Sequence, residues 1–415
     1  MNLIRVFEHE CLSVNENTDN GIFKQHHLER LLEFNDRNKN IYFTPVRKGV
    51  KFRNYVGVIQ IGGLTIEILP KTDKDGQNDK KAYDKWQKVL LDMLAVCRYI
   101  NVNSVSETFL NRKHNSILDI YFEIFLDEVL MLMRKGLIRK YRRQTGNVLT
   151  LKGKLHFGKN IQQNLIHAER FYTDHQVYDY EHLLNNVLYK ALLLLKKMPI
   201  SIHLRDRLQR IFLDFPELQE TSICESDFGK LKETRKTLVY RKALQIARMI
   251  ILNYSPDIRG GKEHMIALLF DMNKLWEFFI YRMLKKYENP NLNIEYSKTK
   301  KFWENKLIKP DIIMRYKHRH GEDISVLDVK WKAPENNEPS DSDLKQMFAY
   351  NIYWESYRGF LLYPQTSNIE DKSGVFHKGL GGISTCTMTY VNILNNQGRL
   401  NMDIGREILE KCGVY

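Results

Sequence analysis

Two short segments organise this chain, KPDIIMRY at residues 309–316 and ISVLDVKW at residues 324–331. Both are rich in β-branched and aromatic residues and are bounded by turn-forming residues, so both are predicted to be strands. Side chains two residues apart leave the same face of a strand, which places Asp328 and Lys330 together. With Asp311 on the neighbouring strand, two carboxylates and an ammonium group are expected to converge on one spot.

This cluster of charged groups suits metal-dependent hydrolysis. Carboxylate oxygens are the ligands that Mg²⁺ prefers in proteins. A lysine beside them can orient a water molecule or stabilise charge that develops on a phosphate. The order Pro-Asp, then Asp-x-Lys, resembles the motif of the PD-(D/E)xK nuclease superfamily. Alone, the triplet is also compatible with a solvated surface hairpin, so its surroundings decide between the two interpretations.

The segment after the second strand fits a nuclease core. Ser and Asp residues at 340–343 form an N-cap cluster, and apolar residues at helical spacing predict a helix over 344–354. Gln346 and Tyr350 are four residues apart and therefore lie on one face of that helix. Residues 360–364 are then predicted to form a buried strand.

The segment before the two strands fits the same core. Residues 272–286 have the apolar spacing of an amphipathic helix, and this helix carries Glu277. Helix, strands, helix and strand is the core order of the nuclease superfamily, and a Gln-x-x-x-Tyr pattern on the later helix recurs in several of its branches. The whole arrangement therefore favours the nuclease interpretation over the solvated hairpin.

The chain is basic and long enough for several domains. Its 415 residues suggest two or three domains, and 64 Lys and Arg against 50 Asp and Glu give a net charge of +14. Such an excess favours a polyanionic partner, either nucleic acid or an anionic membrane. The five cysteines are scattered and never spaced as Cys-x-x-Cys, which argues for a reducing compartment and against a zinc or iron–sulfur site.

Patterns that the sequence lacks exclude several classes of protein. There is no Gly-x-x-x-x-Gly-Lys-Ser/Thr loop, so the chain is not expected to bind or hydrolyse a nucleotide itself. The start has no signal-peptide core, and acidic residues interrupt the longest apolar run, at 117–133. We therefore expect a cytoplasmic protein that has no membrane span.

Changes of pattern along the chain predict a multidomain protein of mixed α+β and α/β class. Residues 1–80 are expected to form a β-rich domain, residues 81–265 a mainly helical middle region, and residues 266–415 a restriction-endonuclease-like α/β core. The functional groups of the two predicted strands belong to the last of these segments.

Three segments outside that core are strongly basic, at residues 45–53, 139–143 and 152–159. Each is interpreted either as a contact with DNA, as a contact with a partner protein, or as a solvated surface. The last two flank a short turn and are predicted to pair with each other as a hairpin.

Motifs spread over most of the chain resemble those of the McrC family, the nuclease subunits of McrBC-type modification-dependent restriction systems. The matching segments are IQIGGLTIEILPK (59–71), GLIRKY (136–141), LKGKL (151–155), LDVKWK (327–332), DLKQMFAY (343–350) and LLYP (361–364). Lys345 departs from the family pattern, which often has an aromatic residue there, and the charged residues at 73–81 are an expected insertion.

The resemblance implies a division of labour with a second protein. The partner would be an McrB-like AAA+ ring that hydrolyses GTP and carries the reader of modified cytosine in double-stranded DNA. This chain would dock on the ring through its N-terminal part, stimulate the GTPase and supply the cleavage site. The missing phosphate-binding loop agrees with that division.

The residues themselves suggest how cleavage would proceed. Asp311 and Asp328, with the carbonyl of Val329, would hold Mg²⁺, or Mn²⁺ in its place. Lys330 would position the attacking water or stabilise the pentavalent phosphate. Glu277 is either a further carboxylate of the site or a helix-surface charge beside Lys274.

Further alternatives remain for the helix after the strands and for the chain as a whole. Gln346 and Tyr350 either contact DNA, brace the site, or simply pack the helix. A nuclease-fold adaptor that binds DNA without cutting it is one alternative function, and the intact pair of aspartates with its lysine speaks against it. A stand-alone repair nuclease is another, and it leaves the N-terminal β domain without a purpose.

Overall fold

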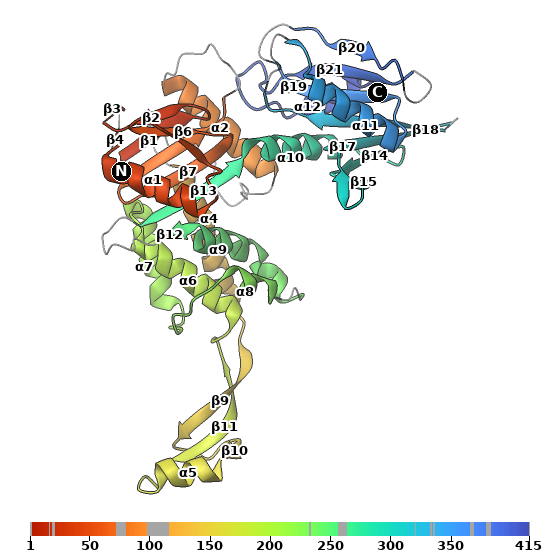
Figure 1. Cartoon of the computed structure of the whole chain (residues 1–415). Helices are drawn as coiled ribbons and strands as arrows, with labels where there is room; N and C mark the ends of the chain where they lie inside the picture. Colours follow the sequence, from red (N-terminus) through yellow and green to blue (C-terminus); the bar gives the residue numbers. More distant parts are fainter. Residues whose placement is uncertain are drawn as a thin grey trace. The chain divides into compact units, whose positions relative to one another are not determined.

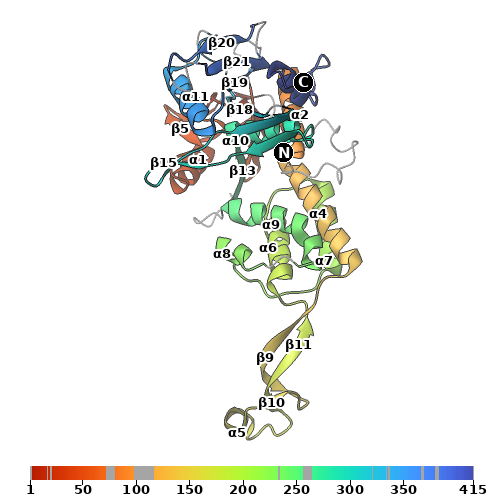
Figure 2. The ribbon, with the colours of Figure 1, turned by 90° about the vertical axis from the view of Figure 1, so that its right-hand side faces the viewer.

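The computed structural model describes most of the chain (Figures 1 and 2). The described residues are 2–15, 17–18, 21–71, 80–97, 116–231, 234–255, 264–319, 321–332, 334, 337–365, 369–378 and 383–414. They form two compact units, one built from residues within 59–63 and 103–268, the other from residues within 2–58, 64–102 and 269–415. Helices and several sheets are mixed in the chain, in agreement with the predicted mixed α and β class.

The N-terminal part is rich in strands, as its β-branched residues predict. Its larger sheet has the order β1-β8-β7-β13-β12, and its smaller one the order β2-β6-β5. The strands of the larger sheet are β1 (Asn2–Phe7), β8 (Leu64–Leu69), β7 (Tyr55–Ile61), β13 (Met265–Asp271) and β12 (Tyr254–Ser255). Those of the smaller sheet are β2 (Cys11–Ser13), β6 (Gly49–Phe52) and β5 (Phe43–Val46). Two short strands, β3 (Asn17–Thr18) and β4 (Gly21–Ile22), pair with each other, and the helices of this part are α1 (Gln25–Arg37) and α2 (Lys80–Val96).

Helices dominate the unit that is built from residues within 59–63 and 103–268. The helices are α4 (Ile117–Lys135), α6 (Leu183–Lys197), α7 (Ile202–Asp214), α8 (Glu225–Gly229), the 3-10 turn η2 (Thr237–Tyr240) and α9 (Arg241–Asn253). Ser116 caps α4, because its hydroxyl accepts a hydrogen bond from the amide of Asp119 at 3.2 Å. Among the described helices, none is long and apolar enough to cross a membrane.

A narrow β arm interrupts these helices and extends away from them in both views (Figures 1 and 2). Its elements are β9 (Lys140–Val148), β10 (Lys154–Leu155), β11 (Phe171–Asp179) and α5 (Phe157–Asn164). The predicted hairpin between the two basic segments is wrong: β9 and β10 both pair with β11, which lies between them. Since β11 runs antiparallel to β9 over nine residue pairs, the returning strand and not the second basic segment completes the hairpin.

The C-terminal part contains a six-stranded sheet of order β14-β17-β18-β19-β21-β20. Its strands are β14 (Leu292–Tyr296), β17 (Ile312–His318), β18 (Gly321–Val329), β19 (Arg358–Pro364), β21 (Thr385–Val391) and β20 (Lys372–Val375). Its helices are α10 (Met272–Lys285), α11 (Asp341–Trp354) and α12 (Ile404–Lys411). The two strands and the two helices predicted around the Asp and Lys motif are thus all present.

Helix α11 packs on this sheet and places the catalytic candidates. Met347, Tyr350 and Trp354 on its inner face share a core with Ile313 of β17 and Leu361 of β19. The strand β19 lies parallel to β18 with Asp328 opposite Leu361, so the motif strand is central in the sheet. A central strand flanked on both sides is held rigidly, which suits a catalytic group at its end.

Candidate active site

The register of two neighbouring strands brings the predicted carboxylates together. β17 and β18 are antiparallel with Ile312 opposite Leu327, and Asp311 and Asp328 are the next residues beyond this pair. The amide of Val329 donates a hydrogen bond of 2.8 Å to Asp311 Oδ2, which fixes that side chain against the end of β18. Asp311 and Asp328 thus lie at the ends of two adjacent strands, and their role as a metal-binding pair stays a prediction.

Lys330 bridges the cluster to helix α11. Its Nζ lies 2.7 Å from Asp328 Oδ2 and 3.0 Å from Asp343 Oδ1. Burial lowers the pKa of Lys330, but the two carboxylates outweigh burial and leave the pKa above its ordinary value. The side chain is therefore an ammonium group at neutral pH, held between two anions.

Asp343 belongs to the site, although the sequence around it predicts only a helix N-terminus. Its backbone amide donates to Ser340 Oγ at 3.1 Å, as the helix N-cap predicts. Its carboxylate nonetheless reaches Lys330, and Ser340 Oγ donates to Asp343 Oδ2 at 2.7 Å. An acidic residue in the first turn of the helix could have been recognised as a partner for the lysine only if the approach of α11 to β18 had been known.

Asp311, Asp328 and Glu277 form an acidic cluster, and burial raises the pKa of each of these three carboxyls. For Asp311, burial is followed by repulsion from Asp328 and Glu277, and for Asp328 the attraction of Lys330 offsets only part of the effect. Burial and then repulsion from Asp328 raise the pKa of Glu277 to about 7. Three acidic groups that repel one another form a place where a cation is favoured.

The oxygen atoms of Asp311, Asp328 and the Val329 carbonyl suit Mg²⁺ as part of a coordination shell that water and phosphate complete. In the described part of the chain, no three His, Cys, Asp or Glu side chains stand close enough together to hold a metal ion by themselves. Asp328 Oδ2 is buried and accepts no hydrogen bond of good geometry, although Lys330 Nζ lies 2.7 Å away. Because Mg²⁺ keeps several waters and binds through one or two carboxylates plus phosphate oxygens, two aspartates and a carbonyl are a sufficient protein contribution.

The cluster lines a polar cavity of about 690 Å³. Glu277, Asp311, Asp328, Lys330 and Gln346 all face this cavity. Of the catalytic residues predicted from the sequence, only Tyr350 does not line the cavity. Glu277 is half-buried on α10, and its place in the cavity lining favours a carboxylate of the site over a helix-surface charge beside Lys274.

Tyr350 instead braces the segment that carries Asp311. Its hydroxyl donates to the carbonyl of Lys309 at 2.7 Å and accepts a hydrogen bond of 2.6 Å from Gln346 Nε2. Burial raises the pKa of Tyr350 to about 12, so the hydroxyl stays protonated and keeps donating at any ordinary pH. Of the alternatives for this pair, bracing is the one that its hydrogen bonds favour.

Glu8, near the N-terminus, holds Trp331, which lies just beyond the end of strand β18. Trp331, which follows Lys330, donates from Nε1 to Glu8 Oε1 at 2.5 Å and packs edge-on against Trp276 at 5.3 Å between ring centroids. Both partners of this hydrogen bond are buried, and burial raises the pKa of Glu8 to about 7. No local pattern connects residues separated by 323 positions, so sequence reasoning could not find this contact.

The model of the family described as McrBC 5-methylcytosine restriction system component matches residues 50–364, well over half of the chain. The chain belongs to this family. The matched range includes every residue of the acidic cluster. It also includes the cavity lining contributed by α10 and α11.

Individual relatives of this McrBC-family chain are distant. It is 22% identical over 178 residues to the type IV methyl-directed restriction enzyme EcoKMcrBC of Escherichia coli K12, with 41% of this chain and 51% of that protein covered. The chain thus spans about half the length of the curated relative that it matches.

Two solved structures from Thermococcus gammatolerans share the fold, each at 17% identity. One is the refined half-complex of a tetradecameric assembly of McrB AAA+ hexamers with bound McrC. Its TM-score is 0.71, and the superposition covers 99% of this chain and 100% of that chain. The other is a cryo-EM structure of the McrBC complex. Its TM-score is 0.50, and the superposition covers 68% of this chain and 87% of that chain.

The basic segments of the McrBC-family chain lie on strands, on turns and, for residues 157–159, at the start of helix α5. Arg47 and Lys48 form the exposed turn between β5 and β6. Arg142 and Arg143 of β9 are ion-paired across the arm with Asp179 and Asp174 of β11. Part of the positive charge of segment 139–143 is therefore neutralised by ion pairs within the arm. The turn at Arg47 and Lys48 is exposed to solvent.

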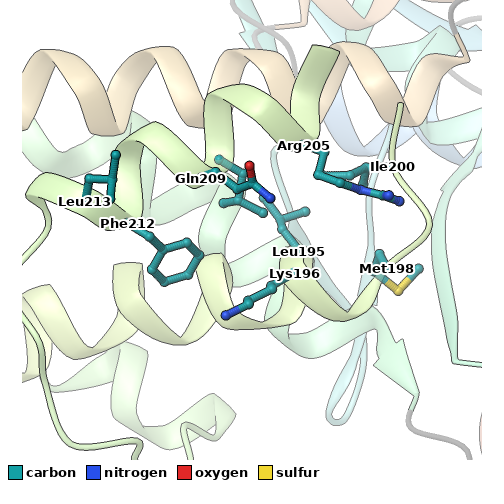
Figure 3. A pocket seen from close by; sticks show the side chains of 9 residues that line it. Leu195, Lys196, Met198, Ile200, Arg205, Gln209, Phe212 and Leu213 are labelled. Carbon is teal, nitrogen blue, oxygen red and sulfur yellow. The ribbon is translucent and has the colours of Figure 1, made fainter. Parts of the chain in front are cut away.

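A second pocket of the McrBC-family chain, of about 440 Å³, is formed by α6 and α7 (Figure 3). Leu195, Met198, Ile200, Phe212 and Leu213 contribute apolar side chains. Lys196 and Arg205 add cations, but within the lining there is no carboxylate or nucleophile. The pocket carries none of the chemistry of the acidic cluster, and we assign it no role.

Proposed function

We propose that this chain is the Mg²⁺-dependent endonuclease subunit of a modification-dependent restriction complex, with a PD-(D/E)xK-type catalytic core. The observation that carries the proposal is the convergence of Asp311, Asp328 and Lys330 at the ends of adjacent strands, inside an open polar cavity. Membership of the restriction-system family supports the same activity.

The side chains of the cavity have separate roles in the proposed hydrolysis. Asp311 and Asp328, with the carbonyl of Val329, would hold Mg²⁺ or Mn²⁺, which when bound lowers the pKa of water and screens a phosphate. Lys330, held as an ammonium group between Asp328 and Asp343, orients the attacking water or stabilises charge on the phosphate. Glu277 adds a third carboxyl that can hold a proton near neutral pH.

Two hydrogen bonds outside the cluster keep these groups in place. Tyr350 holds the carbonyl of Lys309, two residues before Asp311, and Glu8 holds the ring of Trp331, next to Lys330. Small displacements of catalytic groups cost large factors in rate, so such supports matter as much as the reactive groups.

We propose further that the chain works on an McrB-like AAA+ GTPase ring. The support is the likeness of almost the whole chain to an McrC chain bound to McrB hexamers, and the absence of a phosphate-binding loop from the sequence. The ring would recognise modified cytosine in double-stranded DNA, and this chain would stimulate its GTPase and cut the DNA in the cytoplasm.

Two surfaces of the chain are suited to that docking. The N-terminal domain, residues 1–80, presents the exposed basic turn at Arg47 and Lys48. The arm presents apolar side chains around α5, where Phe157 is 72% exposed and Ile166 is 91% exposed. Exposed apolar patches of this kind mark contacts with proteins, so the arm favours a partner over DNA for its basic segments.

The proposal is tested with the chain and an McrB-like AAA+ GTPase of the same organism. We expect the pair to cut a cytosine-methylated plasmid in the presence of GTP and Mg²⁺, to leave the unmethylated plasmid intact, and to stop when EDTA removes the metal. Mn²⁺ should restore cleavage, because it accepts the same oxygen ligands. Cleavage by the chain alone would instead establish the stand-alone nuclease. Retention of DNA without any cutting would establish the adaptor.

A further inference from the structure

A short hairpin in the C-terminal part of the chain has no role in the hydrolysis described above. It is formed by β15 (Lys300–Trp303) and β16 (Lys306–Ile308), which pair as a two-stranded sheet of their own. The hairpin connects β14 to β17 and projects from the six-stranded sheet in both views (Figures 1 and 2). It follows an edge strand and leads directly into the segment that carries Asp311.

The hairpin is strongly basic. Residues 298–309 contain five lysines and a single glutamate. Residues 298–307 are all exposed, and for Lys301 and Lys306 the described residues provide no ion pair. Unpaired lysines on a projecting element attract a polyanion, whereas lysine is depleted from the centres of protein–protein interfaces.

Large apolar side chains stand among these lysines. Trp303 is 61% exposed and Leu307 is 59% exposed, although burial would be favourable for both. The turn between the two strands is tight, with Glu304 at a φ of 47°, so Trp303 is held beside the tip and opposite Lys306. An exposed tryptophan flanked by cations is the arrangement with which proteins stack on nucleic acid bases.

The base of the hairpin is fixed to helix α11. Lys300 Nζ donates to the carbonyl of Tyr353 at 2.5 Å and lies 5.1 Å from the centroid of the Trp354 ring. Tyr353 in turn donates from its hydroxyl to the carbonyl of Phe302 at 3.2 Å, and the two rings lie 5.6 Å apart. A hairpin anchored in this way presents Trp303 at low entropic cost to a ligand.

The hairpin and the acidic cluster share one segment of chain. The eight residues from Trp303 to Asp311 span at most about 26 Å of extended strand, which is about eight base pairs of B-DNA. Tyr350 holds this segment at the carbonyl of Lys309. A nucleotide bound at Trp303 would therefore lie within about one helical turn of a phosphate at Asp311.

We propose that the β15–β16 hairpin is a DNA-binding element of this chain, in which Trp303 stacks on or wedges between bases and Lys301 and Lys306 contact backbone phosphates. This inference rests on the proposed function, since it names the element that grips the substrate beside the cleavage site. Wedging residues of this kind unstack a base step and bend the duplex, which exposes the phosphate to be cut.

Binding of the full chain to a short fluorescein-labelled duplex tests the proposal, with EDTA present so that no DNA is cut. Trp303→Ala should weaken binding by roughly five- to a hundredfold, the range for loss of one base–aromatic contact, with the salt dependence unchanged. Trp303→Phe should retain most of the affinity, because it keeps an aromatic face. Tyr357→Ala is the matched control, since Tyr357 is 55% exposed in the same unit but lies outside the hairpin.

The lysines are tested by the salt dependence of the same binding. Replacing Lys301 and Lys306 with alanine should reduce the slope of log affinity against log salt by about 1.8, since each phosphate contact contributes about 0.9. Lys317→Ala, an exposed lysine at the end of β17, should leave the affinity within about twofold.

Three results would overturn the inference, and they differ in what else they affect. Unchanged DNA affinity of Trp303→Ala, with methylated plasmid still cut by the unaltered complex, would refute the hairpin alone. Weaker association of Trp303→Ala with the GTPase ring, at unchanged DNA affinity, would assign the hairpin to a protein partner. Failure of the unaltered chain and its GTPase ring together to bind or cut methylated DNA would refute the proposed function as well.

Discussion

Asp328→Asn is expected to lower Mg²⁺-dependent cleavage of methylated plasmid by at least about a hundredfold. The substitution removes one of the two anionic groups that are proposed to hold the metal. A bound metal contributes several kcal/mol of transition-state stabilisation, and each loss of about 1.36 kcal/mol lowers the rate tenfold. The measurement is the single-turnover cleavage rate of the complex with saturating GTP and Mg²⁺. Cleavage at near the unaltered rate would remove Asp328 from the site.

Loss of activity in this variant should not come from loss of the fold. Burial raises the pKa of Asp328, so its ionised form is disfavoured in the folded protein and destabilises it at neutral pH. The substitution also removes the ion pair between Asp328 and Lys330, which works in the opposite direction, while Lys330 keeps its ion pair with Asp343, so the thermal unfolding temperature should change little. Asp341→Asn is the matched control, because the Asp341 side chain is 93% exposed and lies outside the cavity. It should cut at the unaltered rate.

Stimulation of the partner's GTPase should separate from cleavage. The double substitution Asp311→Ala, Asp328→Ala is expected to abolish cutting and still raise GTP turnover by the ring, since neither side chain belongs to the proposed docking surfaces. Charge reversal at Arg47, Lys48, Lys51 and Arg53 is expected to lower the stimulation severalfold and, through it, cleavage of long DNA. GTP turnover by the partner, measured at saturating concentration of each variant, decides between the two surfaces.

The arm provides the second half of this test. Replacing Phe157 and Ile161, which are 72% and 61% exposed, with serine should also weaken stimulation if the arm reaches the ring. Both side chains are solvated, so these changes should not alter the fold. Loss of stimulation in the nuclease variant, together with full stimulation in both surface variants, would show that the proposed division of roles along the chain is wrong.

The strands and the helix around the Asp and Lys motif could be predicted from the sequence because their signals are local. β-branched residues bounded by turns predicted β17 and β18, and the capped apolar stripe predicted α11, so the convergence of Asp311 and Asp328 followed from strand geometry. A period of two along each strand and of 3.6 along the helix suffices for such an argument.

The parts that escaped prediction depend on contacts between distant segments or lack a local pattern. Asp343 reaches Lys330 only because α11 packs beside β18, and Glu8 reaches Trp331 across most of the chain. β9 has polar residues on both faces, because it projects into solvent, and it shows no apolar alternation that would identify β11 as its partner. The division of the chain into three domains, at 1–80, 81–265 and 266–415, stays a prediction.

Binding of Mn²⁺ to the full chain, followed by the electron paramagnetic resonance signal of the free ion, tests the acidic cluster most directly. The account predicts that the unaltered chain and Asp341→Asn take up Mn²⁺ in competition with Mg²⁺, and that Asp311→Asn and Asp328→Asn each weaken the uptake by at least about tenfold. Equal uptake by all four proteins would contradict the assignment of Asp311 and Asp328 as the metal-binding pair.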